Sequence, residues 1–163
     1  MYSSLSTIIY FSKLLKLDLV ECAGCFKFVS DITGAVPNRQ FDLKHVALNE
    51  FVSPTAIIEP QDERNIHLVN FLKACPNLCS LHFGHWNLDP LPPGLKKYLQ
   101  SRGKDLTSLS LYSKTEIINA KEFDLICRSC PNLEQFAAGV DEEFLMPEMW
   151  YINLKDFVVS YND

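Results

Sequence analysis

The sequence lacks the positive charge that would attract nucleic acid or an anionic membrane. Its 15 Lys and Arg residues are outnumbered by 20 Asp and Glu residues, which leaves a formal net charge of −5, and no cluster of basic residues offsets that balance. Binding to either polyanion through bulk electrostatics requires a basic field. We therefore expect neither nucleic acid nor a membrane as the partner.

A long apolar segment is also missing. Spanning a bilayer would take a run of about 18 apolar residues, and the chain has none. Residues 1–11 are apolar enough to resemble an export signal, but they begin without a basic region, and Ser6 and Thr7 interrupt the apolar run. A chain that is not exported keeps its six cysteines as free thiols, so we expect a cytoplasmic or nuclear protein.

The motifs that accompany common enzyme activities are absent as well. With only 6 glycines, the sequence has neither a glycine-rich phosphate loop nor a Gly-x-Ser-x-Gly elbow. No histidine is expected beside a thiol at the start of a helix, where a reactive cysteine would have a lowered pKa. We therefore predict that the chain is not an enzyme and needs no cofactor.

What the sequence does contain is a recurring apolar pattern. Residues 75–83 read CPNLCSLHF and residues 130–138 read CPNLEQFAA. Both contain an apolar residue, two variable residues, an apolar residue, a variable residue and a third apolar residue, written LxxLxL. Recurrence of one short pattern at intervals of 20 to 50 residues indicates a repeat architecture. The copies begin at Leu14, Leu43, Leu78, Leu106, Leu133 and Leu154.

The pattern predicts a strand in every copy and a helix between most of them. Successive residues of a strand point to opposite faces, so the fourth and sixth positions of each copy would face a core, and the third, fifth and seventh would be free. Apolar residues recur with helical periodicity at 26–36, 62–75 and 95–103. In the second of these segments we expect Asp62 to be the N-cap and Ile66 to lie beside the apolar stripe. A further helix is expected after Asn119 and Glu122, which resemble a capping box.

A single strand and helix cannot bury an apolar face alone, so such units must stack. Stacking aligns the strands into a parallel sheet with the helices outside it. We predict one α/β domain over residues 1–163, a solenoid of about six irregular units with a curved parallel sheet on its concave side and helices on its convex side.

The pattern resembles a leucine-rich repeat, and the two Cys-Pro-Asn-Leu segments resemble the cysteine-containing repeats of F-box proteins. No F-box sequence is visible in the chain. The resemblance implies that the array holds the target protein of a cullin-based ubiquitin ligase, whereas a missing F-box would dock the ligase adaptor. The alternative is a stand-alone leucine-rich-repeat scaffold or regulatory binding protein unrelated to ubiquitin.

The two ends of the array also bear on its organisation. Terminal units of a solenoid normally present a polar outer face. Here the last copy ends on Phe157-Val158-Val159 without a closing helix, and no cap precedes the first copy. We therefore expect the sequence to be a fragment or an uncapped array.

The free face of the predicted sheet is the candidate binding surface for another protein. Trp86, just beyond a strand end and close to three prolines, is a candidate rim anchor, with packing beneath that loop as the alternative. The candidate binding residues on the free face are Lys16, Asp18, His45, Asn49, Ser80, His82, Ser108, Ser110, Tyr112, Gln135 and Asp156.

Closely spaced cysteines raise the question of a metal site, because paired thiolates can share one zinc ion. Cys75 and Cys130, however, occupy equivalent positions of the pattern, which favours core packing. Cys79, His82 and His85 are spaced by three in a predicted strand, so successive members point to opposite faces. We expect no metal. The pairs considered are Cys22 with Cys25, Cys75 with Cys79, and Cys127 with Cys130.

Overall fold

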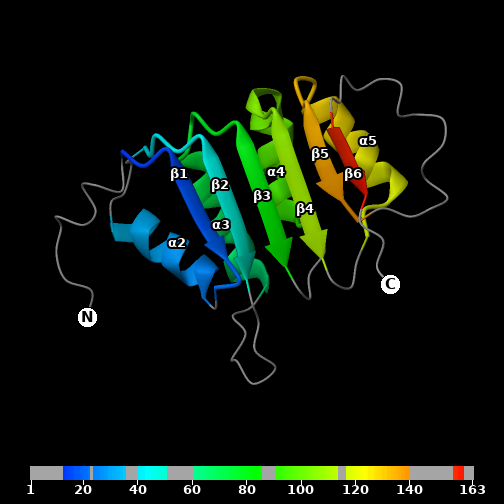
Figure 1. The fold of residues 1–163 in the computed structure, drawn as a ribbon. Helices are drawn as coiled ribbons and strands as arrows, with labels where there is room; N and C mark the ends of the chain where they lie inside the picture. The colour runs from blue at the N-terminus through cyan, green and yellow to red at the C-terminus, as the bar shows by residue number, and fades with distance from the viewer. Residues whose placement is uncertain are drawn as a thin grey trace.

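A computed structural model of the protein describes residues 13–22, 24–35, 40–50, 61–85, 91–113, 117–139 and 156–159. Its centre is a six-stranded sheet in which every neighbouring pair is parallel and the strands follow one another in chain order (Figure 1). Each strand begins two residues after the start of one LxxLxL copy. The strands are β1 (Lys16–Val20), β2 (His45–Glu50), β3 (Ser80–His85), β4 (Ser108–Ser113), β5 (Gln135–Ala138) and β6 (Asp156–Val159).

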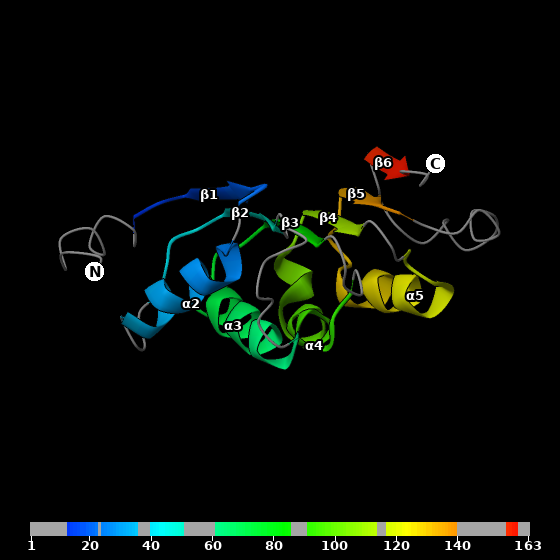
Figure 2. The same cartoon turned by 90° about the horizontal axis from the view of Figure 1, so that it is seen from below.

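Four α-helices alternate with the strands, and all of them lie on one side of the sheet (Figure 2). This arrangement confirms the predicted α/β class with a parallel sheet. Within the described part of the chain, no helix covers the other side. The helices are α2 (Cys25–Ala35), α3 (Gln61–Lys73), α4 (Pro93–Arg102) and α5 (Ala120–Ser129), and a 3-10 turn, η1 (Gly103–Asp105), follows α4.

The core lies between the helices and the sheet. Alternate residues of the strands form two buried rows, which the strand register aligns across the sheet. Full burial of a Val, Leu or Phe side chain contributes about 1.5–3 kcal/mol before the entropy of ordering is subtracted, and Leu19, at the edge, is only partly buried. The first row contains Leu17, Val46, Leu81, Leu109 and Phe136, and the second contains Leu19, Leu48, Phe83, Leu111 and Ala138.

The strand register is reinforced by backbone hydrogen bonds that recur at the start of successive strands. The carbonyl oxygen of Leu15 accepts the N–H groups of Lys44 at 2.8 Å and His45 at 3.1 Å. The carbonyl oxygens of the equivalent residues Lys44, Cys79 and Thr107 each accept two N–H groups from the next copy in the same way. A slip of one residue would break all of these bonds and turn the core row toward the other face.

The capping box predicted before α5 is present. The Asn119 side-chain oxygen accepts the N–H groups of Lys121 at 3.1 Å and Glu122 at 3.2 Å, and the Glu122 carboxylate accepts the Asn119 N–H at 3.4 Å. The second carboxylate oxygen of Glu122 lies 2.7 Å from the Lys96 ammonium. Glu122 therefore both starts α5 and ties it to α4.

Two details of α3 differ from the prediction. The helix begins at Gln61, so Asp62 lies inside its first turn rather than at the N-cap. Ile66 is 57% exposed, whereas Leu68 and Leu72 are each 1% exposed. The reason is geometric, because residues two apart on an α-helix are separated by about 200° around its axis. Ile66 therefore points away from the face that Leu68 buries.

Candidate functional site

The helix-free face is the side of the sheet formed by strand residues that alternate with the buried rows. The register places its side chains in three rows across neighbouring strands. The first row is Lys16, His45, Ser80, Ser108 and Gln135; the second is Asp18, Ala47, His82, Ser110 and Ala137; the third is Val20, Asn49, Gly84 and Tyr112.

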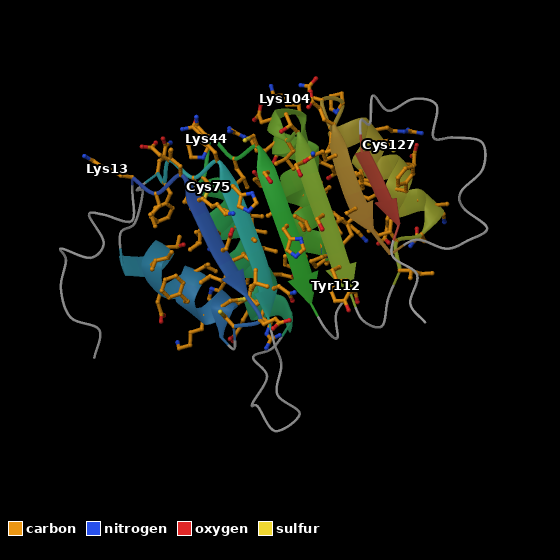
Figure 3. All side chains as sticks on the ribbon, in the orientation of Figure 1. Lys13, Lys44, Cys75, Lys104, Tyr112 and Cys127 are labelled. Carbon is orange, nitrogen blue, oxygen red and sulfur yellow. The ribbon has the colours of Figure 1, made fainter. Side chains whose placement is uncertain are left out.

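All the predicted binding residues whose side chains the structure describes lie on the helix-free face. Asp156 occupies the β6 position opposite Gln135, but its side chain lies outside the described residues. Trp86, the predicted rim anchor, also lies outside them. Tyr112 lies near the carboxyl end of β4 (Figure 3). That these residues contact a partner stays a prediction.

A hydrogen-bonded chain of polar side chains crosses the first three strands. Lys16 Nζ lies 2.8 Å from Asp18 Oδ2, and Asp18 Oδ1 lies 3.0 Å from His45 Nε2. The other ring nitrogen, His45 Nδ1, lies 2.9 Å from Ser80 Oγ. We refer to Asp18, His45 and Ser80 together as the polar relay. It joins β1, β2 and β3 on the helix-free face.

The direction of the hydrogen bonds in the polar relay follows from the carboxylate. The hydrogen bond from Lys16 is the main cause that lowers the pKa of Asp18 below its ordinary value, so Asp18 is ionised at neutral pH and can only accept. In a neutral imidazole, His45 Nε2 then carries the proton. His45 Nδ1 is left as an acceptor for the Ser80 hydroxyl.

His82 lies on β3 two residues after Ser80, in the middle row of the face. Burial lowers the pKa of His82 from the ordinary 6.5, and the nearby His45 lowers it further, whereas the Asp18 carboxylate opposes the shift. The environment therefore favours neutral imidazole at this position. A partner meeting the face at neutral pH would meet an uncharged His82.

Asn49 and Gly84 meet in the third row. A Cβ atom added at Gly84 would lie 2.9 Å from Asn49 Cγ, so only glycine leaves room for this amide without a shift. Asn49 Oδ1 is buried and has no hydrogen-bond partner among the described residues. This close approach of β2 and β3 shapes the face near the carboxyl ends of the two strands.

The rest of the helix-free face is small and uncharged. Among its described side chains the only Lys, Arg, Asp or Glu residues are Lys16 and Asp18, and they form an ion pair with each other. From β3 to β5 the first two rows contain hydroxyls and alanine besides His82 and Gln135. Such a surface offers hydrogen bonds and close approach rather than a strong electrostatic field.

The cysteines that the repeat pattern placed at equivalent positions are in the core. Cys75 and Cys130 are each 1% exposed, and burial raises the pKa of each thiol to about 12. The Cys75 thiol donates to the Phe71 carbonyl oxygen at 3.2 Å. In the described ranges, no group of three or more His, Cys, Asp or Glu side chains is arranged to hold a metal ion.

Comparisons with known families and curated proteins were made for the whole sequence. No protein-family model matches the chain, and a search of curated proteins finds no match. None of the helices that the structure describes is both long enough and apolar enough to cross a membrane.

The polar relay is the feature that the sequence did not predict. Each of its members was expected on the free face, but their mutual contacts were not. A signal was present, since Lys16, His45 and Ser80 occupy the same position of three successive copies and must therefore be lateral neighbours. Only the side-chain conformations add that Asp18 reaches across to His45.

Proposed function

We propose that this chain is a leucine-rich-repeat array that binds another protein through its helix-free face. The same structural features recur in successive copies of the LxxLxL pattern, and this recurrence supports the repeat assignment. Each strand begins at the third position of a copy, and the same carbonyl position accepts two N–H groups in four successive strand pairs. Cys75 and Cys130 are buried equivalently.

The single observation that carries the binding proposal is the one-sided covering of the sheet. In the part of the chain that the structure describes, the helices all lie on one face, and the other face presents aligned rows of partly exposed polar side chains (Figure 2). Repeat arrays use such an extended surface to recognise a macromolecule by shape with a few anchoring side chains. Tyr112 and His82, which are partly exposed on the neighbouring inner strands β4 and β3, are the anchors we assign.

We further propose that the array is the substrate-recognition region of an F-box-type ubiquitin ligase receptor, acting in the cytoplasm or nucleus. The two Cys-Pro-Asn-Leu segments support this subclass. The ligase adaptor would dock on an F-box outside this chain, and the target protein would occupy the helix-free face. Co-purification of a cullin adaptor with the full-length natural protein tests this point. Its absence, with the face still binding a protein, favours a stand-alone scaffold.

Site-specific photo-crosslinking tests the binding surface. A benzophenone side chain placed at Tyr112 should capture the partner, whereas the same side chain at the exposed Lys121 of α5 should not. With the captured protein purified, His82→Ala and Tyr112→Ala should each weaken its affinity about tenfold, as expected for interface anchors. Lys121→Ala is the matched control. Equal crosslinking from both positions, or unchanged affinity in both face variants, would overturn the assignment.

A further inference from the structure

We propose that Ser80 is an activated nucleophile that accepts acyl groups from activated esters, with His45 as its general base and Asp18 as the residue that positions His45. This inference goes beyond the binding role and does not depend on it. It concerns the polar relay, which joins three strands at one corner of the helix-free face.

The distances and roles match what nucleophilic catalysis requires. A serine needs a base within about 2.6–3.2 Å of its hydroxyl and a third group that orients the base. Ser80 Oγ lies 2.9 Å from His45 Nδ1, and His45 Nε2 lies 3.0 Å from Asp18 Oδ1. The carboxylate holds the ring proton on Nε2, so the lone pair of Nδ1 points to Ser80. The arrangement is that of a Ser-His-Asp triad with the two ring nitrogens exchanged.

The surrounding structure holds this arrangement in place. Lys16 Nζ lies 2.8 Å from Asp18 Oδ2, so it holds the carboxylate through the oxygen that His45 does not contact. The residues belong to strands whose register is set by paired backbone hydrogen bonds, and sites built on strands are held more rigidly than sites on loops. Ser80 remains partly exposed, so an ester can approach it from the helix-free side.

Ser80 differs from the neighbouring serines of the same face. Ser108 lies opposite Ser80 on β4, and Ser110 lies opposite His82. In the described part of the chain, neither has a hydrogen bond to a histidine. They therefore provide internal references for the reactivity of an ordinary serine on this surface.

The proposed step transfers an acyl group and balances without an oxidant or reductant. The Ser80 oxygen attacks the carbonyl carbon of the ester while its proton moves to His45 Nδ1. The bond from that carbon to the alcohol oxygen then breaks, and the departing alcohol takes the proton from His45. Water then attacks the acyl carbon while its proton moves to His45 Nδ1. The bond from that carbon to Ser80 Oγ breaks, Ser80 takes the proton back from His45, and the carboxylic acid leaves.

The substrate class follows from how little can stabilise the oxyanion. Ser80 is on an inner strand, so the backbone N–H groups of β3 are already engaged with β2 and β4. The Ser108 hydroxyl, opposite Ser80, is the neighbouring side-chain donor. One oxyanion donor is worth about 10²–10³ in rate, so a site with one such donor should react with aryl esters and phosphonyl fluorides rather than amides.

The test is covalent labelling of the free protein with a fluorophosphonate probe, mapped by peptide mass spectrometry. We expect labelling at Ser80, loss of the label in Ser80→Ala, and unchanged labelling in Ser110→Ala. His45→Gln should slow labelling about a hundredfold, because it removes the base.

Asp18 needs a readout that a merely structural role would not change. Asp18→Asn should slow labelling about tenfold or more and alter its pH profile, because the amide no longer fixes the ring proton on Nε2. Labelling of Ser80 no faster than that of Ser110, or unaffected by His45→Gln, would overturn the proposal. Either result leaves the partner-binding role untouched, since no partner is present.

A second variant keeps the proposal testable if Ser80→Ala is poorly folded. In Ser80→Cys the sulfur replaces the hydroxyl beside His45, and its alkylation by iodoacetamide should be at least about tenfold faster near neutral pH than in Ser110→Cys. Peptide mapping separates these sites from the native cysteines. Equal alkylation rates in folded samples of the two variants would show that His45 does not activate position 80.

Discussion

The imidazole of His82 illustrates how a single side chain on the helix-free face links its environment to stability. In the strand register, His82 is paired with Ala47 of β2 and with Ser110 of β4. Burial is the main reason that its pKa is below the ordinary 6.5. The folded state therefore resists protonation that the unfolded chain would accept.

The free energy of unfolding should consequently fall as the pH is lowered. Above pH 6.5 His82 is neutral in both states; below it the unfolded chain binds a proton first, and stability is lost until the pH passes the lowered folded pKa. Urea unfolding from about pH 7.5 to about pH 5 measures this dependence. His82→Gln should flatten it.

Asp18 provides an internal comparison, because its pKa is lowered from 3.8 and its contribution is lost only in more acidic solution. Identical pH dependence with and without the His82 imidazole would contradict the prediction.

For single residues, the sequence predicts on which face of the sheet a side chain lies, but not which other side chains it contacts. The period of two in each strand placed Asp18, His45 and Ser80 on the free face. It could not show that they form the polar relay, because the residues are far apart in the chain and the bonds depend on side-chain rotamers. The burial of the Asn49 side-chain oxygen, which has no hydrogen-bond partner among the described residues, was also beyond prediction, since it depends on the close approach of Gly84.

At the scale of the elements, strands were more predictable than helix ends. The strands start in step with the LxxLxL pattern because their two apolar positions must both reach the core. The predicted start of α3 was wrong. Asp62 has the side chain of a capping residue, but it lies one residue inside the helix. Capping preference describes what a side chain can do, and tertiary packing decides where the helix begins.

The ends of α4 and α5 pack so closely that one added carbon atom should lower the stability of the protein. A Cβ atom added at Gly103 would lie 2.5 Å from the Ser129 carbonyl oxygen and 2.7 Å from Cys130 Sγ. Because the obstacle includes backbone and a buried thiol, Gly103→Ala should destabilise the protein by about 1–3 kcal/mol.

The matched control for this substitution is Gly34→Ala in α2, where an added Cβ meets nothing within 4 Å. Alanine is the better helix former, so Gly34→Ala should be neutral or stabilising by up to about 1 kcal/mol. Urea unfolding of the two variants measures both effects. A Gly103→Ala protein as stable as Gly34→Ala would mean that the two helix ends can separate without cost.

At the scale of the whole molecule, the two faces of the sheet have different surroundings. One face is packed against α2, α3, α4 and α5, whereas the helix-free face, called the outer face below, meets no helix in the described part of the chain (Figure 2). Sequence periodicity predicted this division because every copy repeats the same inside and outside positions. The identity of a partner is not predictable in the same way, since it depends on a few outer side chains and on their mutual contacts.

Leu111 and Tyr112 are consecutive on β4 and test whether the two faces are independent. Leu111 is 1% exposed, so Leu111→Ala should leave a cavity and cost about 2–5 kcal/mol in urea unfolding. Tyr112 is partly exposed on the outer face, so Tyr112→Ala should cost less than about 1 kcal/mol.

Partner affinity, measured where both variants are still folded, should show the opposite order, with only Tyr112→Ala weakened. The reason is that the fold depends on the row beneath the helices, whereas binding depends on the row that the helices leave uncovered. A loss of stability from Tyr112→Ala as large as that from Leu111→Ala would show instead that the outer face belongs to the packed interior of this protein.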